Sequence, residues 1–550
     1  MSDTGFDYII VGGGSAGCAM AARLSEDSRN RVLLLEAGDR DGSMKIDMPG
    51  MLIKVVPPNK YNWAFWTERQ EKLNNRRVYW PRGKVLGGSS AINGLLYVRG
   101  HPRDYDEWAQ LGCTGWSFDE VLPYFRKLED SDRPEDALHA RGGPLKTSQH
   151  TSKNPLNDAF LKAGEEMGLP YTDDFNGPSQ EGLGWYDQTI RGGRRQTAAR
   201  AYLHEARGRD NLTILTGAQV RRITFKGKRA TGVEVNRKGR VENWAAGREV
   251  ILCGGAINSP QVLQLSGVGR AEDITPFNIP MVHELSGVGR NLQDHLDMIV
   301  SAPLKQPLSV LKYQAPHRGL WEIGKWLMGL PGPLSDCITP TGGFLRTDPA
   351  LERPDIQLHI MLAMADEAHG LTKATDHGMG IHICPLRPRS RGSIRMKSDD
   401  PLKAPAIDPN YLGEPEDERI MLEGVKLVRR LYRQPALQAM ISGEKAPFDT
   451  IPLDDDAATM EAIRGAAETI YHPVGTCAMG PVDRADSVVD PACRVIGLSG
   501  LRVVDASVMP RLIGGNTNAP TIMIAEKVAH MIRRNAERPD RQDSQHAAPA

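Results

Sequence analysis

A glycine-rich turn near the start of the chain has the residue types and spacing of a phosphate-binding loop. Gly12, Gly14 and Gly17 fit the pattern GxGxxG, with Ser15 and Ala16 before the last glycine. Gly12 permits a tight turn, Gly14 lets the backbone approach a pyrophosphate, and Gly17 allows a helix to pack closely on the preceding strand. Free backbone N–H groups at the start of such a helix bind phosphate oxygens.

The elements around this turn support that interpretation. A β-branched and aromatic run, Phe6–Val11, precedes the glycines, and a helical pattern follows over residues 18–24. A second strand over residues 31–35 ends at Glu36, at the separation where an acidic side chain meets ribose hydroxyls. The order predicts a dinucleotide-binding unit, with a merely structural glycine turn as the alternative. The motif does not choose between NAD and FAD.

A second glycine-rich segment, residues 81–94, includes the pair Gly87 and Gly88 beside small hydroxyl residues. Without side chains, such positions let the backbone come close to a flat ligand. Taken alone, the segment is equally typical of an ordinary loop, because Gly and Ser clusters usually mark turns.

Four segments in one order resemble the glucose-methanol-choline (GMC) oxidoreductase family, and the likeness continues through most of the chain. They are the opening GGGSAG with Glu36, residues 83–94, residues 255–269, and a C-terminal block made of residues 471–477, 503–507 and 514–520. The chain is similar to bacterial choline dehydrogenases and FAD-dependent alcohol dehydrogenases of that family. The resemblance implies oxidation of an alcohol with FAD as cofactor.

The resemblance also implies which residues contact FAD. Glu36 is expected on the adenosine ribose, residues 14–17 on the pyrophosphate and Val220 near adenine. Val85, Asn93 and Asp505 are expected along the ribityl–flavin half, and Gly87 belongs to the matching signature. Some members of the family bind flavin covalently through a histidine in this signature. Ile92 stands at the matching position and His101 is too far along, so noncovalent FAD is expected.

The resemblance assigns the catalytic roles to His472 and Asn516. His472 would take the hydroxyl proton, since an imidazole exchanges protons near neutral pH, and Asn516 would orient the substrate oxygen through its amide. A fixed positive charge that stabilises an alkoxide is the rival role for His472. A core histidine and a helix-capping asparagine are the structural alternatives, although Thr517 or Asn518 suits the cap of the following helix, residues 519–533, better.

Composition excludes several other classes of protein. Lys plus Arg and Asp plus Glu number 68 each, so no net field favours binding to nucleic acid. The seven cysteines are scattered without CxxC pairs, which is typical of reduced cytoplasmic proteins. No metal motif, GxSxG elbow or CxxxxC dithiol stands out, so no metal site, hydrolase or disulfide reductase is expected.

The flavin motifs lie near both ends and in the middle of the chain, which predicts a discontinuous domain. We expect an α/β FAD-binding domain, Rossmann-like and of GMC type, with an inserted α+β substrate domain built on an antiparallel sheet. Three runs of alternating residues, 354–362, 380–386 and 392–396, are expected to form that sheet. The boundaries expected are 1–152, 192–300 and 465–536 for the FAD domain, 153–191 and 301–464 for the substrate domain, and 537–550 for a disordered tail.

The segment 320–334 is amphipathic, with Trp321 and Trp326 among its apolar residues. A helix packed on its own domain is the favoured interpretation, and peripheral contact with the inner membrane is the alternative.

A primary aliphatic or aromatic alcohol is expected as substrate, because no acid for the ammonium of choline can be placed beyond Asp336. A quinone-type electron acceptor is favoured. The alternatives are an oxidase that acts on aryl or furanic alcohols and reduces O₂, or a choline dehydrogenase.

Overall fold

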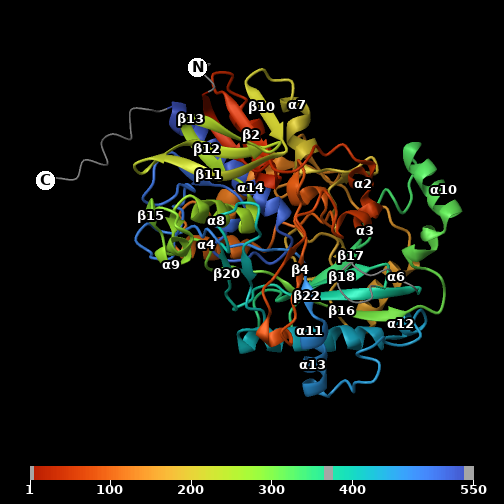
Figure 1. Cartoon of the computed structure of the whole chain (residues 1–550). Coiled ribbons are helices and arrows are strands. Elements are labelled where there is room, and N and C mark those ends of the chain that lie inside the picture. Colours follow the sequence, from red (N-terminus) through yellow and green to blue (C-terminus); the bar gives the residue numbers. More distant parts are fainter. Residues whose placement is uncertain (1–4, 365–375, 538–550) are drawn as a thin grey trace.

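The structure is a computed structural model that describes residues 5–364 and 376–537. The predicted disordered tail therefore lies outside the described residues, except for residue 537. Two sheets dominate the fold (Figure 1). Each has its own large hydrophobic cluster.

The first sheet contains the predicted dinucleotide-binding unit. Its strand order is β10-β2-β1-β13-β12-β11, with β23 paired to β13. The central parallel segments, β2, the last four residues of β1 and the last three of β13, are buried and apolar apart from Glu36, as expected where a sheet is covered on both faces. The bounds of the parallel strands are β1 Phe6–Val11, β2 Val32–Glu36, β10 Leu212–Thr216, β13 Arg240–Leu252 and β23 Leu501–Val503, while β11 Ala218–Lys226 and β12 Arg229–Arg237 are antiparallel.

Two helices from opposite ends of the chain pack together against this sheet. Helix α1, Ser15–Leu24, begins at the glycine turn, and α14, Asn518–Glu537, is the helix expected over residues 519–533. The Ser15 hydroxyl donates to Asn518 Oδ1 at 2.8 Å, and Arg23 forms an ion pair with the buried Glu526. These contacts bring the C-terminal block of the sequence beside the glycine turn.

The second sheet is antiparallel throughout, in the order β22-β16-β19-β18-β17-β7. Its apolar face packs against α11, Pro415–Tyr432, and α6, Pro155–Glu166. The strands are β7 Gly182–Trp185, β16 Leu296–Pro303, β17 Thr341–Leu345, β18 Ile356–Met361, β19 Gly378–Pro385 and β22 Glu468–Thr469. Strands β18 and β19 lie where the runs 354–362 and 380–386 predicted strands.

The third predicted strand does not join this sheet, so that part of the prediction is wrong. Residues Ser393–Arg395 form β20, which pairs only with β21, Ala406–Asp408, in a separate ladder. The Ile394 N–H donates to Gly289 O at 2.7 Å, and Ile394 O accepts from the Gln264 amide at 3.0 Å. These bonds hold the strand against α8, Gly255–Leu265, instead of the second sheet.

The amphipathic segment forms helix α10, Pro316–Leu327, at the right edge of Figure 1. Its buried residues are Glu322 and Trp326, whereas Leu320 and Trp321 are 70% and 65% exposed. The favoured expectation, a helix packed on its own domain, is therefore met through Trp326, while the other large apolar residues of the helix remain exposed.

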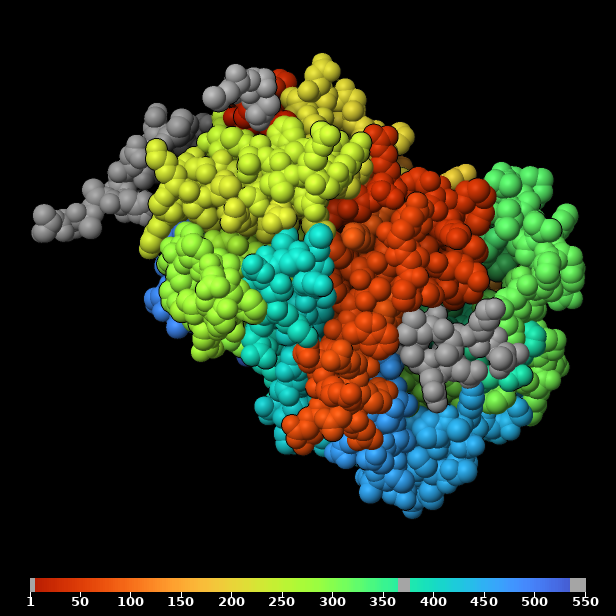
Figure 2. Space-filling model, viewed as in Figure 1, coloured from red at the N-terminus to blue at the C-terminus, as the bar shows by residue number. Residues whose placement is uncertain are grey.

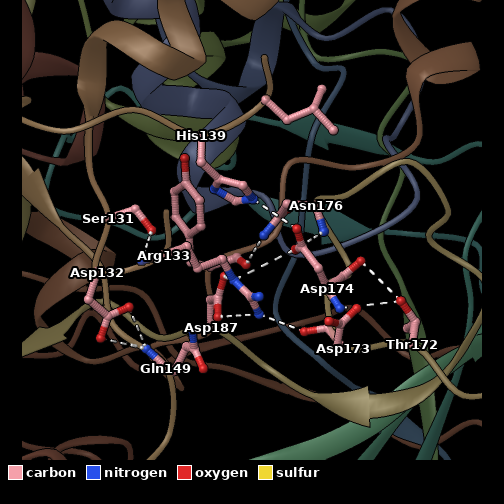
Figure 3. Close-up of polar contacts among 12 residues, drawn as sticks. Ser131, Asp132, Arg133, His139, Gln149, Thr172, Asp173, Asp174, Asn176 and Asp187 are labelled. Carbon is pink, nitrogen blue, oxygen red and sulfur yellow. Dashed lines mark hydrogen bonds and ion pairs between the residues drawn. The ribbon is translucent and has the colours of Figure 1, made fainter. Parts of the chain in front are cut away.

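A buried ionic cluster joins residues 129–139 to residues 172–187 (Figure 3). The ring nitrogens of His139 lie 3.3 Å from Glu129 Oε1 and 2.8 Å from Asp174 Oδ2. Arg133 binds Asp187 through two nitrogens. Burial disfavours the charged imidazole, but the bonds to the two carboxylates outweigh it and raise the pKa of His139 to about 9.

The remaining helices and short strands connect these layers. They include α2 Met44–Asp47, α3 Leu52–Val55, α4 Pro102–Gln110, α5 Phe118–Leu128, α7 His204–Ala206, α9 Ala271–Ile274, α12 Pro435–Gln438, α13 Asp456–Ala466, β3 Phe65–Trp66, β4 Tyr79–Trp80, β5 Glu129–Asp130, β6 Leu145–Lys146, β8 Ile190–Arg191, β9 Arg194–Arg195, β14 Val268–Gly269 and β15 His283–Glu284.

Candidate active site

One cavity of about 370 Å³ runs between the two sheets. Its lining begins at the glycine turn after β1, passes the segments 81–96 and 252–265, and ends against β18, β19 and the loop 470–473. The carboxyl ends of parallel strands are the usual place for a ligand in an open α/β sheet. The predicted nucleotide and catalytic segments therefore border the same space.

The glycine turn is shaped so that only glycine fits. Gly12 has a φ of +103°, and a Cβ there would lie 2.5 Å from Cys253 O. A Cβ on Gly17 would lie 1.8 Å from Gly12 O, which explains the close packing of α1 on the turn. The second glycine-rich segment meets the turn directly, because a Cβ on Gly88 would lie 2.6 Å from the Cα of Gly14.

No side chain caps the N-terminus of α1, which begins after Gly14. Ser15 and Ala16, the first residues of the helix, line the cavity, so the turn offers an uncapped helix N-terminus of the kind that binds phosphate. The residues present thus fit the pyrophosphate of a dinucleotide.

Glu36 is buried at the end of β2, and its carboxylate already accepts two backbone hydrogen bonds. Oε2 accepts from Gly13 N at 2.8 Å and Oε1 from Gly38 N at 2.7 Å. Burial raises the pKa of this carboxyl to about 7. Each oxygen has a second lone pair, so Glu36 retains the capacity to accept from a hydroxyl in the cavity.

The structure brings most of the predicted site residues together. Ten of them line the cavity, namely Gly12, Gly14, Ser15, Ala16, Glu36, Asn93, Val220, His472, Asp505 and Asn516. Gly17, Val85 and Gly87 do not line it. Val85 is fully buried in a small core under the loop, and Gly87 bonds through its N–H to Gly13 O at 2.7 Å. Val85 and Gly87 thus support the wall and do not form its surface.

Asp505 holds the segment 254–259 in place. Its Oδ2 accepts from Gly255 N at 2.8 Å and from the Ser259 hydroxyl at 2.6 Å, and its Oδ1 accepts from Ser507 N. The two carboxylates that line the described cavity, Glu36 and Asp505, therefore both already accept hydrogen bonds from the protein. Asp336 lies elsewhere and accepts from Thr151.

Backbone bonds fix the loop that carries His472. Its N–H donates to Asp294 Oδ1 at 2.7 Å, and Gln293 and Val474 exchange two backbone hydrogen bonds. The preceding residue, Tyr471, has a φ of +70°, a conformation that non-glycine residues rarely adopt. Arg82 stabilises it by donating to Tyr471 O at 2.5 Å.

The hydrogen bonds of His295 determine which nitrogen of His472 carries a proton. His295 Nε2 lies 2.9 Å from Leu386 O, and because a carbonyl can only accept, Nε2 is protonated. Burial lowers the pKa of His295 to about 4, so the ring is neutral and its Nδ1 is an acceptor. His295 Nδ1 lies 2.9 Å from His472 Nδ1, which must therefore donate.

His472 is left with an unprotonated Nε2. Burial, with a further contribution from His295, holds the pKa of His472 well below its usual value, so the neutral form persists at pH 7. The amide nitrogen of Asn516 lies 3.3 Å from this Nε2. The Asn516 Nδ2–H donates to this lone pair at the cavity, and a substrate hydroxyl would take the place of that bond.

The orientation of the Asn516 amide is set from the other side. Gln357, on β18, donates to Asn516 Oδ1 at 3.1 Å and to the Tyr186 hydroxyl at 3.1 Å. Because Oδ1 accepts this bond, Nδ2 is the atom that faces His472. The side chain of Asn516 is thus engaged in the cavity, and Thr517 is the residue that directly precedes α14.

The far wall of the cavity is formed by the second sheet and by apolar residues. His359 and Met361 on β18 and His382 on β19 line it, with Ile338 and Ile470 nearby. His359 is 2% exposed, and neither ring nitrogen has a partner among the described residues. Burial lowers its pKa to about 3, so it offers a neutral imidazole to a ligand.

Several of these residues were missed from the sequence. Arg82 lies inside the 81–94 segment, so the sequence could have indicated that it lines the cavity. Burial lowers the pKa of Arg82 to about 10. Asp294, His295 and Gln357 gave no such signal, because 177 residues separate His295 from His472 and only the fold joins them.

Within the described residues, no group of His, Cys, Asp or Glu could hold a metal ion. In the same part of the chain, no helix is both long and apolar enough to cross a bilayer.

Comparison with known proteins identifies the family. The models for the N- and C-terminal parts of GMC oxidoreductases match residues 6–297 and 388–525. The chain is 44% identical over 538 residues to alcohol dehydrogenase [acceptor] of Pseudomonas putida, covering 97% of this chain and 96% of that protein. It is 42% identical over 535 residues to the mitochondrial choline dehydrogenase of Homo sapiens, covering 96% and 90%.

Solved structures agree. Pyridoxine 4-oxidase from "Mesorbium loti" superimposes with a TM-score of 0.87 at 32% identity, covering 96% of this chain and 99% of that chain. Formate oxidase superimposes with a TM-score of 0.89 at 28% identity, covering 97% and 99%. The chain belongs to the GMC oxidoreductase family.

Proposed function

We propose that this protein oxidises a primary alcohol to an aldehyde and passes the electrons to a quinone-type acceptor. It is an FAD-dependent oxidoreductase that acts on alcohol-type donors. The single observation that carries the proposal is the pair formed by His472 Nε2 and the Asn516 amide, at the end of a cavity that begins at the glycine turn.

The cofactor would be held as the sequence indicates. Gly14, Ser15 and Ala16 would bind the pyrophosphate, Glu36 a ribose hydroxyl and Val220 the adenine, while Asn93 and Asp505 would lie along the flavin half. When bound, FAD supplies the acceptor for a hydride. Ile92 lines the cavity where covalent members have histidine, which supports noncovalent binding.

Two protein atoms, Asn516 Nδ2 and His472 Nε2, would act on the substrate hydroxyl. The substrate hydroxyl would accept a hydrogen bond from Asn516 Nδ2 and donate one to His472 Nε2, which then takes its proton. The neutral state of the buried His472 supports this role as a base over that of a fixed positive charge. General-base catalysis of this kind contributes about 10²–10⁴-fold to a rate.

The second sheet would form the substrate side of the cavity. We assign residues 153–191 and 301–464 to the substrate domain, and residues 1–152, 192–300 and 465–536 to the FAD domain. His359 and Met361 come from the former and the glycine turn from the latter, and both line the cavity. We expect His359 to bond a polar group of the substrate, since its two nitrogens are buried without partners.

An uncharged alcohol fits this half of the cavity better than choline does. Glu36 and Asp505, the carboxylates of the described lining, are expected to contact FAD and already accept hydrogen bonds from the protein, so neither stands ready to pair with an ammonium group. Choline is nevertheless the second candidate, because relatives such as the human protein carry the name choline dehydrogenase.

The acceptor is proposed from the relatives. The Pseudomonas putida relative is named for an unspecified acceptor, while a fungal aryl-alcohol oxidase shares the fold at 25% identity. A quinone acceptor places the protein at a membrane, and we propose a peripheral contact on the reducing, cytoplasmic side. All seven cysteines are free and buried, in keeping with that compartment.

The test begins with the yellow holoenzyme, mixed anaerobically with benzyl alcohol, a medium-chain alkanol and choline. Bleaching of the flavin by an uncharged alcohol supports the proposal, and a higher kcat/KM for choline would replace it with the second candidate. Admitting air then separates the acceptors, because fast recolouring with peroxide indicates an oxidase, whereas recolouring only on addition of a quinone indicates a dehydrogenase.

His472→Ala tests the mechanism. The variant should keep its FAD, since His472 is bonded to protein groups, but lose at least 100-fold in the rate of flavin reduction by alcohol. His530→Ala is the control, because His530 is exposed on α14 and bonds only Tyr124 among the described residues. A reduction rate near that of the control would remove His472 from the reaction.

A further inference from the structure

The exposed apolar surface of this protein is concentrated on one face. The described residues include twelve exposed large apolar side chains, and seven of them lie on α2, α3 and the segment 320–330. We call this the α10 face, consisting of Met44, Ile53, Leu320, Trp321, Leu327, Met328 and Leu330. Single exposed apolar residues need no explanation, but a cluster of this kind marks a binding surface.

Helix α10 is held to the body by its opposite side. Trp326 donates through Nε1 to Gly193 O at 2.7 Å, and the Arg194 guanidinium lies 4.3 Å from the centre of its ring. Glu322, one turn earlier, is buried and pairs with Lys325 at 2.7 Å. With 3.6 residues per turn, the side chains at 320, 321, 327 and 328 share the face opposite 322 and 326. The contacts of Trp326 and Glu322 therefore orient the helix so that these four apolar side chains point outward.

The helices of the α10 face are physically joined. The loop after α10 reaches the turn Pro49–Met51 that directly precedes α3, where Gly50 N donates to Leu334 O. Arg194, which contacts Trp326, also pairs with Asp47 of α2 at 3.3 Å. Figure 2 shows the segment in green at the right edge, beside the red-orange N-terminal residues.

The charges on this face are basic. Lys45, Lys54 and Arg318 are exposed on the three helices. The carboxylates of the same helices are engaged, since Asp47 pairs with Arg194 and Arg200, and Glu322 pairs with Lys325. A face with exposed tryptophan, aliphatic side chains and cations that form no ion pair with the described residues matches the interface of an anionic bilayer, where each cation near the surface contributes about 1 kcal/mol.

The α10 face shares a residue with the lining of the cavity. Leu52, Ile53 and Val56 line the cavity, and Ile53 is at the same time 40% exposed on the α10 face. The segment at α3 therefore connects this face to the cavity.

We propose that the α10 face binds the surface of an anionic lipid bilayer, with α10 lying in the plane of the interface. The proposed quinone acceptor would enter the cavity past α3, and this second part rests on the proposed function. A second copy of the chain is a poorer occupant, because a two-fold contact would bring the basic residues of both copies together.

The test measures binding of the yellow holoenzyme to vesicles by sedimentation. Vesicles of phosphatidylglycerol and phosphatidylcholine should pellet it at low salt, and vesicles of phosphatidylcholine alone should bind at least tenfold more weakly. The double variant Trp321→Glu, Leu327→Glu should reduce binding to the anionic vesicles by at least tenfold. Val482→Glu is the matched control, because Val482 is 66% exposed but lies outside the α10 face.

Two outcomes would overturn the proposal. One is equal pelleting of the double variant and the Val482→Glu control. The other is a wild-type dimer in gel filtration that the double variant converts to a monomer, which would assign the face to a second copy.

The route of the acceptor is tested separately. The double variant should keep the wild-type rate with a water-soluble dye as acceptor but lose at least fivefold with a quinone embedded in the anionic vesicles. Vesicle binding without any reduction of flavin by alcohols would contradict the proposed function alone, whereas normal alcohol oxidation without vesicle binding would contradict the surface alone.

Discussion

His295 provides the sharpest test of how this site is organised, because the proposed role acts entirely through a neighbouring residue. In His295→Leu, the shape near Cγ is retained but the acceptor for His472 Nδ1–H is lost. His295→Asn is close to isosteric with that variant and returns an oxygen at the position of Nδ1. The pair therefore differs mainly in one hydrogen bond.

The expected loss in the rate of flavin reduction follows from the hydrogen bond between His295 and His472. The Nδ1–Nδ1 distance is 2.9 Å, and both rings are buried. A buried donor left without a partner costs about 1–3 kcal/mol, and His472 escapes this cost by moving its proton to Nε2 or by rotating. Either response removes the lone pair that faces the substrate. At about 1.4 kcal/mol per factor of ten, His295→Leu should slow flavin reduction by about 10–100-fold.

The assay is anaerobic stopped-flow reduction of the bound flavin at saturating alcohol. His295→Asn should recover most of the rate, to within about fivefold of wild type, and both variants should keep wild-type flavin content. A merely structural role would instead give both variants the same rate, or lower their flavin content and melting temperature together. Reduction by His295→Leu at the wild-type rate would refute the reasoning.

Three further outcomes are expected. Gly88→Ala should purify with little FAD, judged by the ratio of absorbance at 450 and 280 nm, because the new Cβ would lie 2.6 Å from the Gly14 Cα, whereas Gly208→Ala has open space and should bind normally. The kcat/KM of the wild type should stay flat through neutral pH and fall only in acid, since the pKa of His472 is held well below its usual value and only the neutral ring accepts a proton. His139→Gln should lower the free energy of unfolding by about 2 kcal/mol at pH 7. The folded pKa of His139, about 9, exceeds the unfolded value, so its contribution is full below about pH 6.5 and lost as pH rises through 9; a difference from wild type that persists at pH 10 in denaturant titrations would contradict this.

The sequence was most informative where function depends on local geometry. The turn at Gly12, the acid at Glu36 and the parallel strands around them are set by neighbours in the chain, so their spacing alone predicted a nucleotide site. His472 and Asn516 came from resemblance, and the structure places them 3.3 Å apart. The residues that orient these two side chains through hydrogen bonds could not be predicted from the sequence. His295 acts across 177 residues, and no local pattern reports a contact that exists only after the two sheets have packed.

The same limit explains the strand prediction that was wrong and the α10 prediction that was met only in part. The run 392–396 alternates as a strand should, but alternation does not choose a partner, and the backbone of Ile394 is bonded to Gly289 and Gln264 instead of the second sheet. In α10, periodicity located an apolar face correctly and left its direction open, because the pattern is the same whether that face meets protein or lipid. The direction is decided by Trp326, whose indole binds Gly193 and Arg194 and turns the remaining apolar residues outward. Helix α10 is attached to the protein through one tryptophan and a buried ion pair, and its other large apolar side chains are exposed. It is therefore better understood as a binding surface for another molecule than as part of the hydrophobic core.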